Sequence, residues 1–163
     1  MANSYNIQVL RDGPRNFVVR VTGEIDMTAA PPVDVPPTVL VDVTTLNPPC
    51  KALRVDRVKY SLPHGTPLDV QLWWQATTNE LFFGAGGGDD GDYWNFGGLT
   101  NNAAPGATGN ILFSTSGITG QEAVNGTSVY GPETLTFAMI VECVKLQPTR
   151  NLQGALNDKL RYF

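Results

Sequence analysis

Residues 52–76 read Ala-Leu-Arg-Val-Asp-Arg-Val-Lys-Tyr-Ser-Leu-Pro-His-Gly-Thr-Pro-Leu-Asp-Val-Gln-Leu-Trp-Trp-Gln-Ala. From Leu53 to Tyr60, apolar and polar side chains alternate, as they do in a strand with one buried face. Leu68–Ala76 has the β-branched and aromatic residues of a second strand. Pro63–Pro67 has the length and the Pro/Gly composition of a hairpin connection. This stretch therefore predicts two long strands joined by a tight turn.

The strand pattern continues on both sides of this stretch. Further runs lie at Asn6–Leu10, Asn16–Thr22, Thr38–Val43, Ile111–Ser114 and Thr134–Leu146, and turn residues separate them. No helical repeat longer than two turns occurs before residue 148. The pattern predicts an all-β fold: an antiparallel β-sandwich, jelly-roll-like, of about eight strands, with a C-terminal extended or short helical arm.

A chain of 163 residues is in the usual range for one domain. We expect a β-sandwich domain over residues 1–146 and a C-terminal arm over 147–163. Within the arm, Leu152, Leu156 and Leu160 are spaced by four and form one apolar stripe on a short helix. So short a helix is marginal alone. The arm is therefore expected to order by docking on its own domain or on a neighbour.

The charge balance argues against a nucleic-acid partner. The formal net charge is −4, from 15 acidic and 11 basic residues, whereas nucleic-acid binders carry a basic footprint. Arg54, Arg57 and Lys59 are grouped, but their alternation with apolar residues indicates a solvated, charged strand face. The sequence begins without the pattern of a signal peptide and has no apolar run long enough for a membrane span. We expect synthesis in the cytoplasm and no membrane partner.

Catalytic residues are not grouped in any pattern that indicates an enzyme. The one histidine, His64, lies in a turn, and no nucleophile elbow accompanies it. Cys50 and Cys143 are far apart in the sequence and give no zinc-ligand spacing. Whether these two cysteines pair is left open. We expect no enzymatic activity and no cofactor.

The acidic cluster Asp89, Asp90 and Asp92 is the best candidate for a metal site, with calcium as the ion. Calcium takes carboxylate and carbonyl oxygens from flexible loops, and the glycines around this cluster permit tight winding. The cluster lacks the spaced ligands of the twelve-residue calcium loop. A solvated loop tip is therefore the favoured interpretation, within an expected Gly-rich loop from Gly84 to Asn102.

Aromatic and leucine side chains provide the candidate interface. Trp73 and Trp74 are adjacent, so on a strand only one of them faces the core. The other needs a loop, a ligand or a partner, and we favour subunit contacts over sugar. The candidate interface residues are Trp73, Trp74, Tyr93, Trp94, Phe96, Leu152, Leu156, Leu160, Tyr162 and Phe163.

Several segments resemble a family of small virion structural proteins from tailed phages, some of which are described as capsid decoration or cement proteins. The resemblance covers most of residues 5–146. It is carried by Val9–Asn16, Arg20–Gly23, Leu53–Asp56, Val70–Thr78, Trp94–Asn102 and Gly106–Ile111, of which Trp94–Asn102 is the most specific. The proline-rich segment 29–37 and the tail 147–163 are longer than a minimal family member needs.

The resemblance implies a sandwich that assembles as a homotrimer on the capsid surface of a virion and binds the major capsid protein. Binding to the assembled shell alone would shift its equilibrium toward assembly. Two other possibilities stay open. One is a different virion position, such as a collar, adaptor or tail component. The other is a carbohydrate-binding module that uses Trp73 or Trp74 with the loop 84–96.

Overall fold

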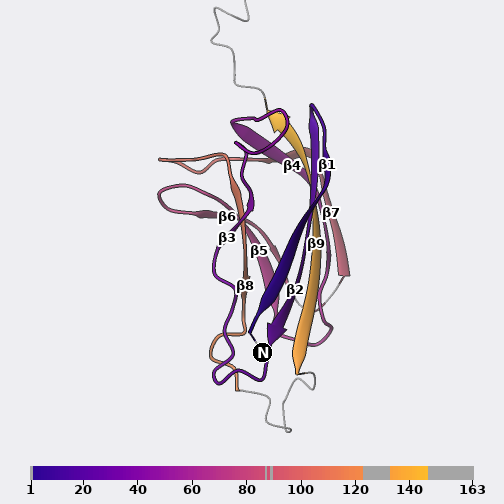
Figure 1. Cartoon of the computed structure of the whole chain (residues 1–163), viewed down its shortest axis with the longest axis vertical. Coiled ribbons are helices and arrows are strands. Elements are labelled where there is room, and N and C mark those ends of the chain that lie inside the picture. Colours follow the sequence, from indigo (N-terminus) through magenta and orange to yellow (C-terminus); the bar gives the residue numbers. More distant parts are fainter. Residues whose placement is uncertain (1, 87, 89, 123–132, 147–163) are drawn as a thin grey trace, which may run out of the picture.

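The computed structural model describes residues 2–146 except 87, 89 and 123–132 (Figure 1). This part of the chain forms nine strands and no helix. The strands are β1 (Ser4–Asp12), β2 (Asn16–Asp26), β3 (Thr38–Val41), β4 (Ala52–Ser61), β5 (Asp69–Trp74), β6 (Glu80–Ala85), β7 (Asp90–Thr100), β8 (Ile111–Ser116) and β9 (Thr134–Leu146). The predicted arm 147–163 lies outside the described residues.

The strands form two antiparallel sheets that face each other. Sheet A has the order β1-β2-β9-β4-β7 and sheet B the order β3-β8-β5-β6. Among the described strands, only β1–β2 and β5–β6 follow each other within one sheet; every other consecutive pair lies in opposite sheets (Figure 1). This is the strand order of a jelly roll, with β1 added at the edge of sheet A. The predicted fold class is confirmed.

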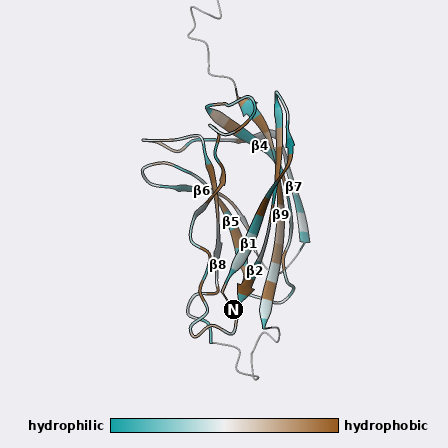
Figure 2. Ribbon diagram, in the orientation of Figure 1, coloured by the Kyte–Doolittle hydropathy of each residue, from teal (hydrophilic) through white to brown (hydrophobic). Residues whose placement is uncertain are grey.

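The core lies between the sheets, and every second residue of β2, β5 and β9 is buried in it. In β9 the buried positions are Leu135, Phe137, Met139, Val141 and Cys143, and the residues between them are less buried or exposed. The hydropathy colouring follows this arrangement along the strands (Figure 2). Two-residue periodicity thus determines which side chains the second sheet covers.

The connection Pro63–Pro67 is not a hairpin, so the hairpin prediction is wrong. β4 pairs with β7 and β9 in sheet A, whereas β5 pairs with β6 and β8 in sheet B. The turn therefore carries the chain from one sheet to the other. Pro and Gly indicate that the chain turns here, but they do not indicate that β4 pairs with β7 and β9, and β5 with β6 and β8.

The expected loop from Gly84 to Asn102 is also wrong, because it contains the end of β6 and the whole of the edge strand β7. β6 continues to Ala85, and β7 begins at Asp90. Glycines inside β7 are used for packing: a Cβ at Gly91 would overlap the ring of Tyr60 on β4. The absence of a side chain at residue 91 lets this ring lie against the edge strand.

The proline-rich segment 29–37 contains no regular structure, as its composition predicts, and it is tied to the end of β8. The carboxylate of Asp34 accepts hydrogen bonds from the amides of Ile118 (3.1 Å) and Thr119 (2.8 Å) and from the hydroxyl of Thr115 (3.0 Å). The amide of Val35 donates to the hydroxyl of Thr115 (2.8 Å), and the carbonyl of Val35 accepts from the Thr115 amide (3.0 Å). The segment therefore extends the edge of sheet B beyond β3.

One end of the sandwich is closed by a buried ion pair. Lys145 occupies an inward-facing position of β9, and its side chain is 0% exposed. Its ammonium group donates to Asp12 (2.5 Å) and to the carbonyl of Pro48 (2.9 Å). Asp12 also accepts from the amide of Asn47. The pair thus joins the ends of β1 and β9 to the loop between β3 and β4.

This ion pair predicts a loss of stability in acid. Burial acts to raise the pKa of Asp12, but hydrogen bonds from Lys145 and from the Asn47 amide outweigh it and hold the pKa below its usual 3.8. A carboxyl whose pKa is lower in the folded state stabilises the fold above its unfolded pKa. This contribution is lost as the pH falls from about 4 through the folded pKa.

Urea unfolding between pH 7 and pH 2 measures this effect. We expect the free energy of unfolding to decrease below about pH 4, and to decrease less steeply in an Asp12→Asn variant, which cannot titrate at this position. Equal acid sensitivity of the two proteins would show that Asp12 does not contribute to it.

Candidate functional site

The two sheets differ in charge. The strands of sheet A contain Arg11, Arg20, Arg54, Arg57, Lys59 and Lys145, whereas the strands of sheet B contain no lysine or arginine. On the outer face of sheet A, Arg57 makes a two-bond ion pair with Asp92, and these hydrogen bonds lower the pKa of Asp92. Lys59 lies 4.0 Å from Glu142. The predicted charged strand face is confirmed.

The outer face of sheet B carries a row of apolar side chains that crosses all four strands. Val39 of β3 pairs with Leu112 of β8, Leu112 pairs with Trp73 of β5, and Trp73 pairs with Leu81 of β6. We call these four residues the apolar row. Val39 is 42% and Leu81 46% exposed. The sequence did not indicate Val39, Leu81 or Leu112, because the pairing register brings them together.

Trp73 is held in place on this face by a hydrogen bond. Its Nε1 donates to Oγ of Ser114 at 2.8 Å, and Ser114 in turn donates to Gln71 at 3.3 Å. Since Ser114 lies two residues beyond Leu112 on β8, the indole lies across that strand. This explains why Leu112 and Ser114 are each only 3% exposed although they point away from the core. A fixed aromatic side chain loses little conformational freedom when a partner binds.

Trp74 belongs to the core and is not available as an interface residue. It is 0% exposed and stacks on Phe82 with ring centroids 3.9 Å apart. A β-bulge at Phe82 lets both Phe82 and Phe83 turn inward, although they are adjacent. The prediction that only one of the two tryptophans faces the core is confirmed, and Trp73 is the outward one.

The aromatic residues of β7 lie at the edge of sheet A, and Tyr93 and Trp94 point to different faces of that strand. Tyr93 packs against Phe83 with ring centroids 5.4 Å apart and closes the edge between β6 and β7. Trp94 is 62% exposed and pairs with Arg57 on the charged face of sheet A. The side chain of Phe96 and the residues Leu152, Leu156, Leu160, Tyr162 and Phe163 lie outside the described part of the structure. The described candidates thus do not form one surface.

The calcium candidates are not brought together around an ion by the residues described. The carboxylate of Asp92 forms an ion pair with Arg57. Asp90 pairs with Ser61 at the start of β7, and Asp89 lies outside the described residues. His64 contacts the Gly-rich turn, with Nδ1 2.8 Å from the carbonyl oxygen of Gly88. In the described part of the chain, no group of three His, Cys, Asp or Glu side chains is arranged to hold a metal.

The two cysteines are free thiols in the structure, and both are buried. Burial raises the pKa of Cys143. Burial also raises the pKa of Cys50, although the positive charge of the nearby Lys145 acts in the opposite direction. Thiols with raised pKa values are poor nucleophiles at neutral pH. They act here as small apolar side chains of the core.

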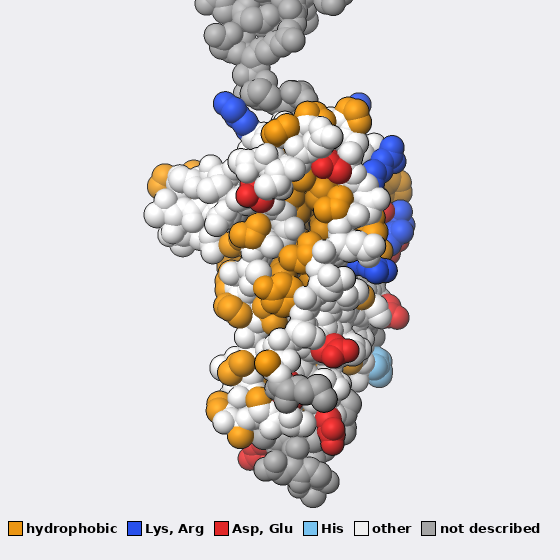
Figure 3. Space-filling view, in the orientation of Figure 1, with side chains coloured by type: hydrophobic (Ala, Val, Ile, Leu, Met, Phe, Trp, Pro, Cys, Tyr) orange, Lys and Arg blue, Asp and Glu red, His pale blue; other side chains and the backbone are white. Residues whose placement is uncertain are grey.

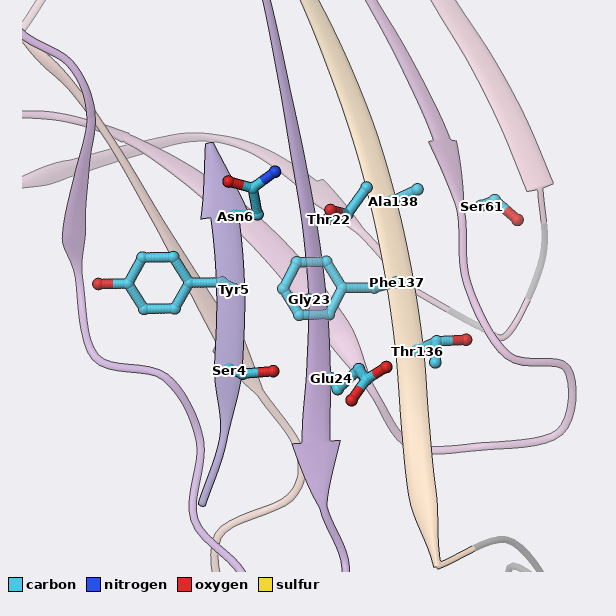
Figure 4. A pocket seen from close by; sticks show the side chains of 10 residues that line it. All are labelled: Ser4, Tyr5, Asn6, Thr22, Gly23, Glu24, Ser61, Thr136, Phe137 and Ala138. Atoms are coloured by element: carbon cyan, nitrogen blue, oxygen red, sulfur yellow. The ribbon is translucent and has the colours of Figure 1, made fainter. Parts of the chain in front are cut away.

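A shallow depression of about 470 Å³ lies on sheet A (Figure 4). It is lined by Ser4, Tyr5, Asn6, Thr22, Gly23, Glu24, Ser61, Thr136, Phe137 and Ala138. The ring of Phe137 covers Gly23, where a Cβ would overlap it. Among these described residues, Glu24 is the one carboxylate, so the lining offers hydrogen bonds but no pair of acid and base groups.

Comparisons with known proteins assign no family to this chain: no family model matches it, and no curated protein is significantly similar. None of the described residues belongs to a helix with the length and hydrophobicity of a membrane span. The candidate site therefore rests on geometry, and the apolar row with Trp73 is its best-defined part.

Proposed function

We propose that this chain is a phage capsid decoration protein, which binds the assembled shell through the outer face of sheet B and stabilises it by bridging neighbouring subunits. The proposal combines the sequence resemblance with one structural observation, the apolar row on a sheet face without basic residues. Its expected partners are the major capsid protein and further copies of the chain, as a homotrimer. Its expected location is the capsid surface.

The composition of the sheet B face supports a protein partner. The centres of protein interfaces are depleted of charged residues and enriched in aromatic ones. The apolar row supplies one indole flanked by two aliphatic side chains that are more than two-fifths exposed. A contiguous apolar patch on a sheet face is typical of surfaces that associate.

A sugar-binding site of the kind considered above has less support. It requires Trp73 or Trp74 beside the segment 84–96, but Trp74 is buried and residues 90–96 lie in β7 on the other sheet. Jelly rolls occur in viral capsid proteins as well as in lectins, so the fold does not decide between them. A collar, adaptor or tail component differs from a decoration protein in the number of copies per particle, because only a decoration protein is repeated over the whole shell.

The decisive experiment is an image reconstruction of purified virus particles that contain the chain. A decoration protein appears as a jelly-roll density repeated over the whole shell. Density confined to the neck or tail would reassign the chain to a collar, adaptor or tail component. Absence of the chain from purified particles, checked by mass spectrometry, would refute a virion role.

Substitutions on the two outer faces test which one binds. We expect Val39→Glu/Leu81→Glu to weaken binding to shells that lack the protein by more than tenfold, because two apolar contacts of about 1.5–3 kcal/mol each are replaced by charges. Trp94→Glu on sheet A is the matched control and should bind normally. Co-sedimentation with shells measures both. Loss of binding only in the Trp94 variant would move the interface to sheet A.

A further inference from the structure

The outer face of β5 carries a glutamine on either side of Trp73. Gln71, Trp73 and Gln75 are two residues apart and therefore point to the same side of an extended chain. Gln75 lies just beyond β5, but its backbone amide still pairs with the carbonyl of Asn110 (3.1 Å), directly before β8. All three side chains are partly buried. The apolar row thus has one amide side chain on each side of its indole.

The orientation of the Gln71 amide is determined by the indole of Trp73. An indole nitrogen can only donate, and Nε1 of Trp73 donates to Oγ of Ser114 at 2.8 Å. The Ser114 hydroxyl uses its own hydrogen for Oε1 of Gln71, at 3.3 Å. Because Oε1 is the acceptor in this bond, both hydrogens of Nε2 remain. Among the described residues, this Nε2 has no hydrogen-bond partner.

The orientation of the Gln75 amide is determined by the backbone of Val43. This backbone nitrogen can only donate, and it donates to Oδ1 of Asn110 at 3.0 Å. Nδ2 of Asn110 is therefore the donor in the next bond, to Oε1 of Gln75 at 2.9 Å. The hydroxyl of Thr108 donates to the same oxygen at 3.0 Å. Nε2 of Gln75 is consequently also left to donate, without an acceptor in the described part of the chain.

The outer face of sheet B therefore presents two oriented amide donors with an indole between them. Four residues of extended chain separate Gln71 from Gln75, which is about 13 Å. The strands of this sheet contain no lysine or arginine, but they do contain Asp69 and Glu80. Figure 3 shows lysine and arginine side chains along the sheet A side, and none on the protruding loops next to sheet B. Neutral acceptors such as carbonyl oxygens fit this face better than phosphate or carboxylate groups.

An extended polypeptide offers neutral acceptors with this spacing. In an extended chain, the carbonyl groups of residues i and i+4 point to the same side and are about 13 Å apart. In an α-helix they are only about 6 Å apart and are already bonded within the helix. A sugar stacked on Trp73 also supplies acceptors, but it leaves Val39 and Leu81 at the ends of the apolar row uncovered. The observations thus favour an extended peptide segment.

We propose that the outer face of sheet B binds an extended segment of its shell partner. The segment lies along β5 and accepts hydrogen bonds from Gln71 and Gln75, while one of its apolar side chains covers Trp73. This inference rests on the proposed function, in which the same face binds the shell. Amide groups that are already oriented lose little conformational freedom on binding. Bonds to the main chain provide affinity, and the side chain over the indole provides specificity.

The variant Gln71→Glu/Gln75→Glu tests the two donors. It replaces each NH₂ group by an oxygen and keeps the oxygen that accepts within the sheet, so circular dichroism and urea unfolding should be unchanged. We expect binding to shells that lack the protein, measured by co-sedimentation, to weaken at least tenfold, because each carboxylate oxygen then faces a carbonyl oxygen. The loss should persist at about 0.5 M salt, where charge effects are screened. Asn6→Asp/Gln8→Glu makes the same chemical change on the outer face of sheet A and should bind normally.

Photo-crosslinking tests whether one continuous segment is bound. Gln71→Cys and Gln75→Cys proteins are each labelled with a photoreactive maleimide and added to the shells separately; Cys50 and Cys143 are buried. Mass spectrometry should place both crosslinks in one segment of the shell protein, about four residues apart.

The outcomes separate this inference from the proposed function. Shells that bind the unmodified protein and the glutamate variant equally well would overturn the inference and leave the proposed function intact. A loss that high salt reverses, or crosslinks in two separate segments, would overturn it as well. Shells that do not bind the unmodified protein would refute the proposed function and this inference with it. Binding to a glycan array that the glutamate variant loses would assign the two donors to sugar instead.

Discussion

Trp74→Ala is expected to lower the free energy of unfolding by about 3–5 kcal/mol, the range for removing a large buried aromatic side chain. Trp74 is 0% exposed and stacks on Phe82 between the sheets. Removing its indole therefore leaves a cavity in the core beside Phe82. Urea denaturation monitored by circular dichroism measures the change, and the midpoint should shift without a change of slope.

The neighbouring residue supplies the matched control. Trp73→Ala removes an indole of the same size from the outer face, where it is already partly solvated, and should cost about 1–2 kcal/mol. A second variant, Trp74→Phe, keeps a ring on Phe82 and removes the Nε1 group, which has no hydrogen-bond partner among the described residues. It should retain most of the stability. Equal losses for Trp73→Ala and Trp74→Ala would contradict the assignment of the two faces.

Asp12→Ala is expected to cost about 3–5 kcal/mol, because it leaves the ammonium group of Lys145 buried without its counter-ion. The Lys145 side chain is 0% exposed, and the carbonyl of Pro48 is its other hydrogen-bond partner. An uncompensated charge in this position also releases the loop 42–50 from the ends of β1 and β9. Guanidinium or urea unfolding at pH 7 measures the loss.

Lys145→Met should cost less than Asp12→Ala. The carboxylate that remains is 24% exposed and can be hydrated, and methionine fills the space of the lysine stem. The double variant Asp12→Ala/Lys145→Met should resemble Lys145→Met, since the two groups act as one unit. Additive losses in the double variant would show that the ion pair does not couple the two residues.

Parity along strands made part of the site predictable from the sequence. Arg57 and Lys59 share one parity and lie on the charged outer face, as the ion pairs confirm. The β-bulge between Val55 and Arg57 brings Arg54, which has the other parity, to the same face. The adjacent Trp73 and Trp74 had to point to opposite sides, and they do. These predictions depend on the geometry of a single strand, which is determined by neighbouring residues.

Pairing between distant strands was not predictable in the same way. Pro63–Pro67 has the composition of a hairpin turn but connects two strands of different sheets. The glycines before and within β7 are typical of a loop, although residues 90–100 form an edge strand. The apolar row depends on three registers, β3–β8, β5–β8 and β5–β6, and on the bulge at Phe82, which shifts Leu81 opposite Trp73. None of these is encoded by a local pattern, because each depends on which strand supplies the partner.

The sequence by itself determined that this chain forms an antiparallel sandwich and which side of each regular strand is apolar, because alternation acts over two residues. Only the tertiary structure decided which strands are neighbours, that Val39, Leu112, Trp73 and Leu81 form one surface, and that β1 forms the edge of sheet A. The physical reason is that sheet order and register are settled by contacts between residues far apart in the chain.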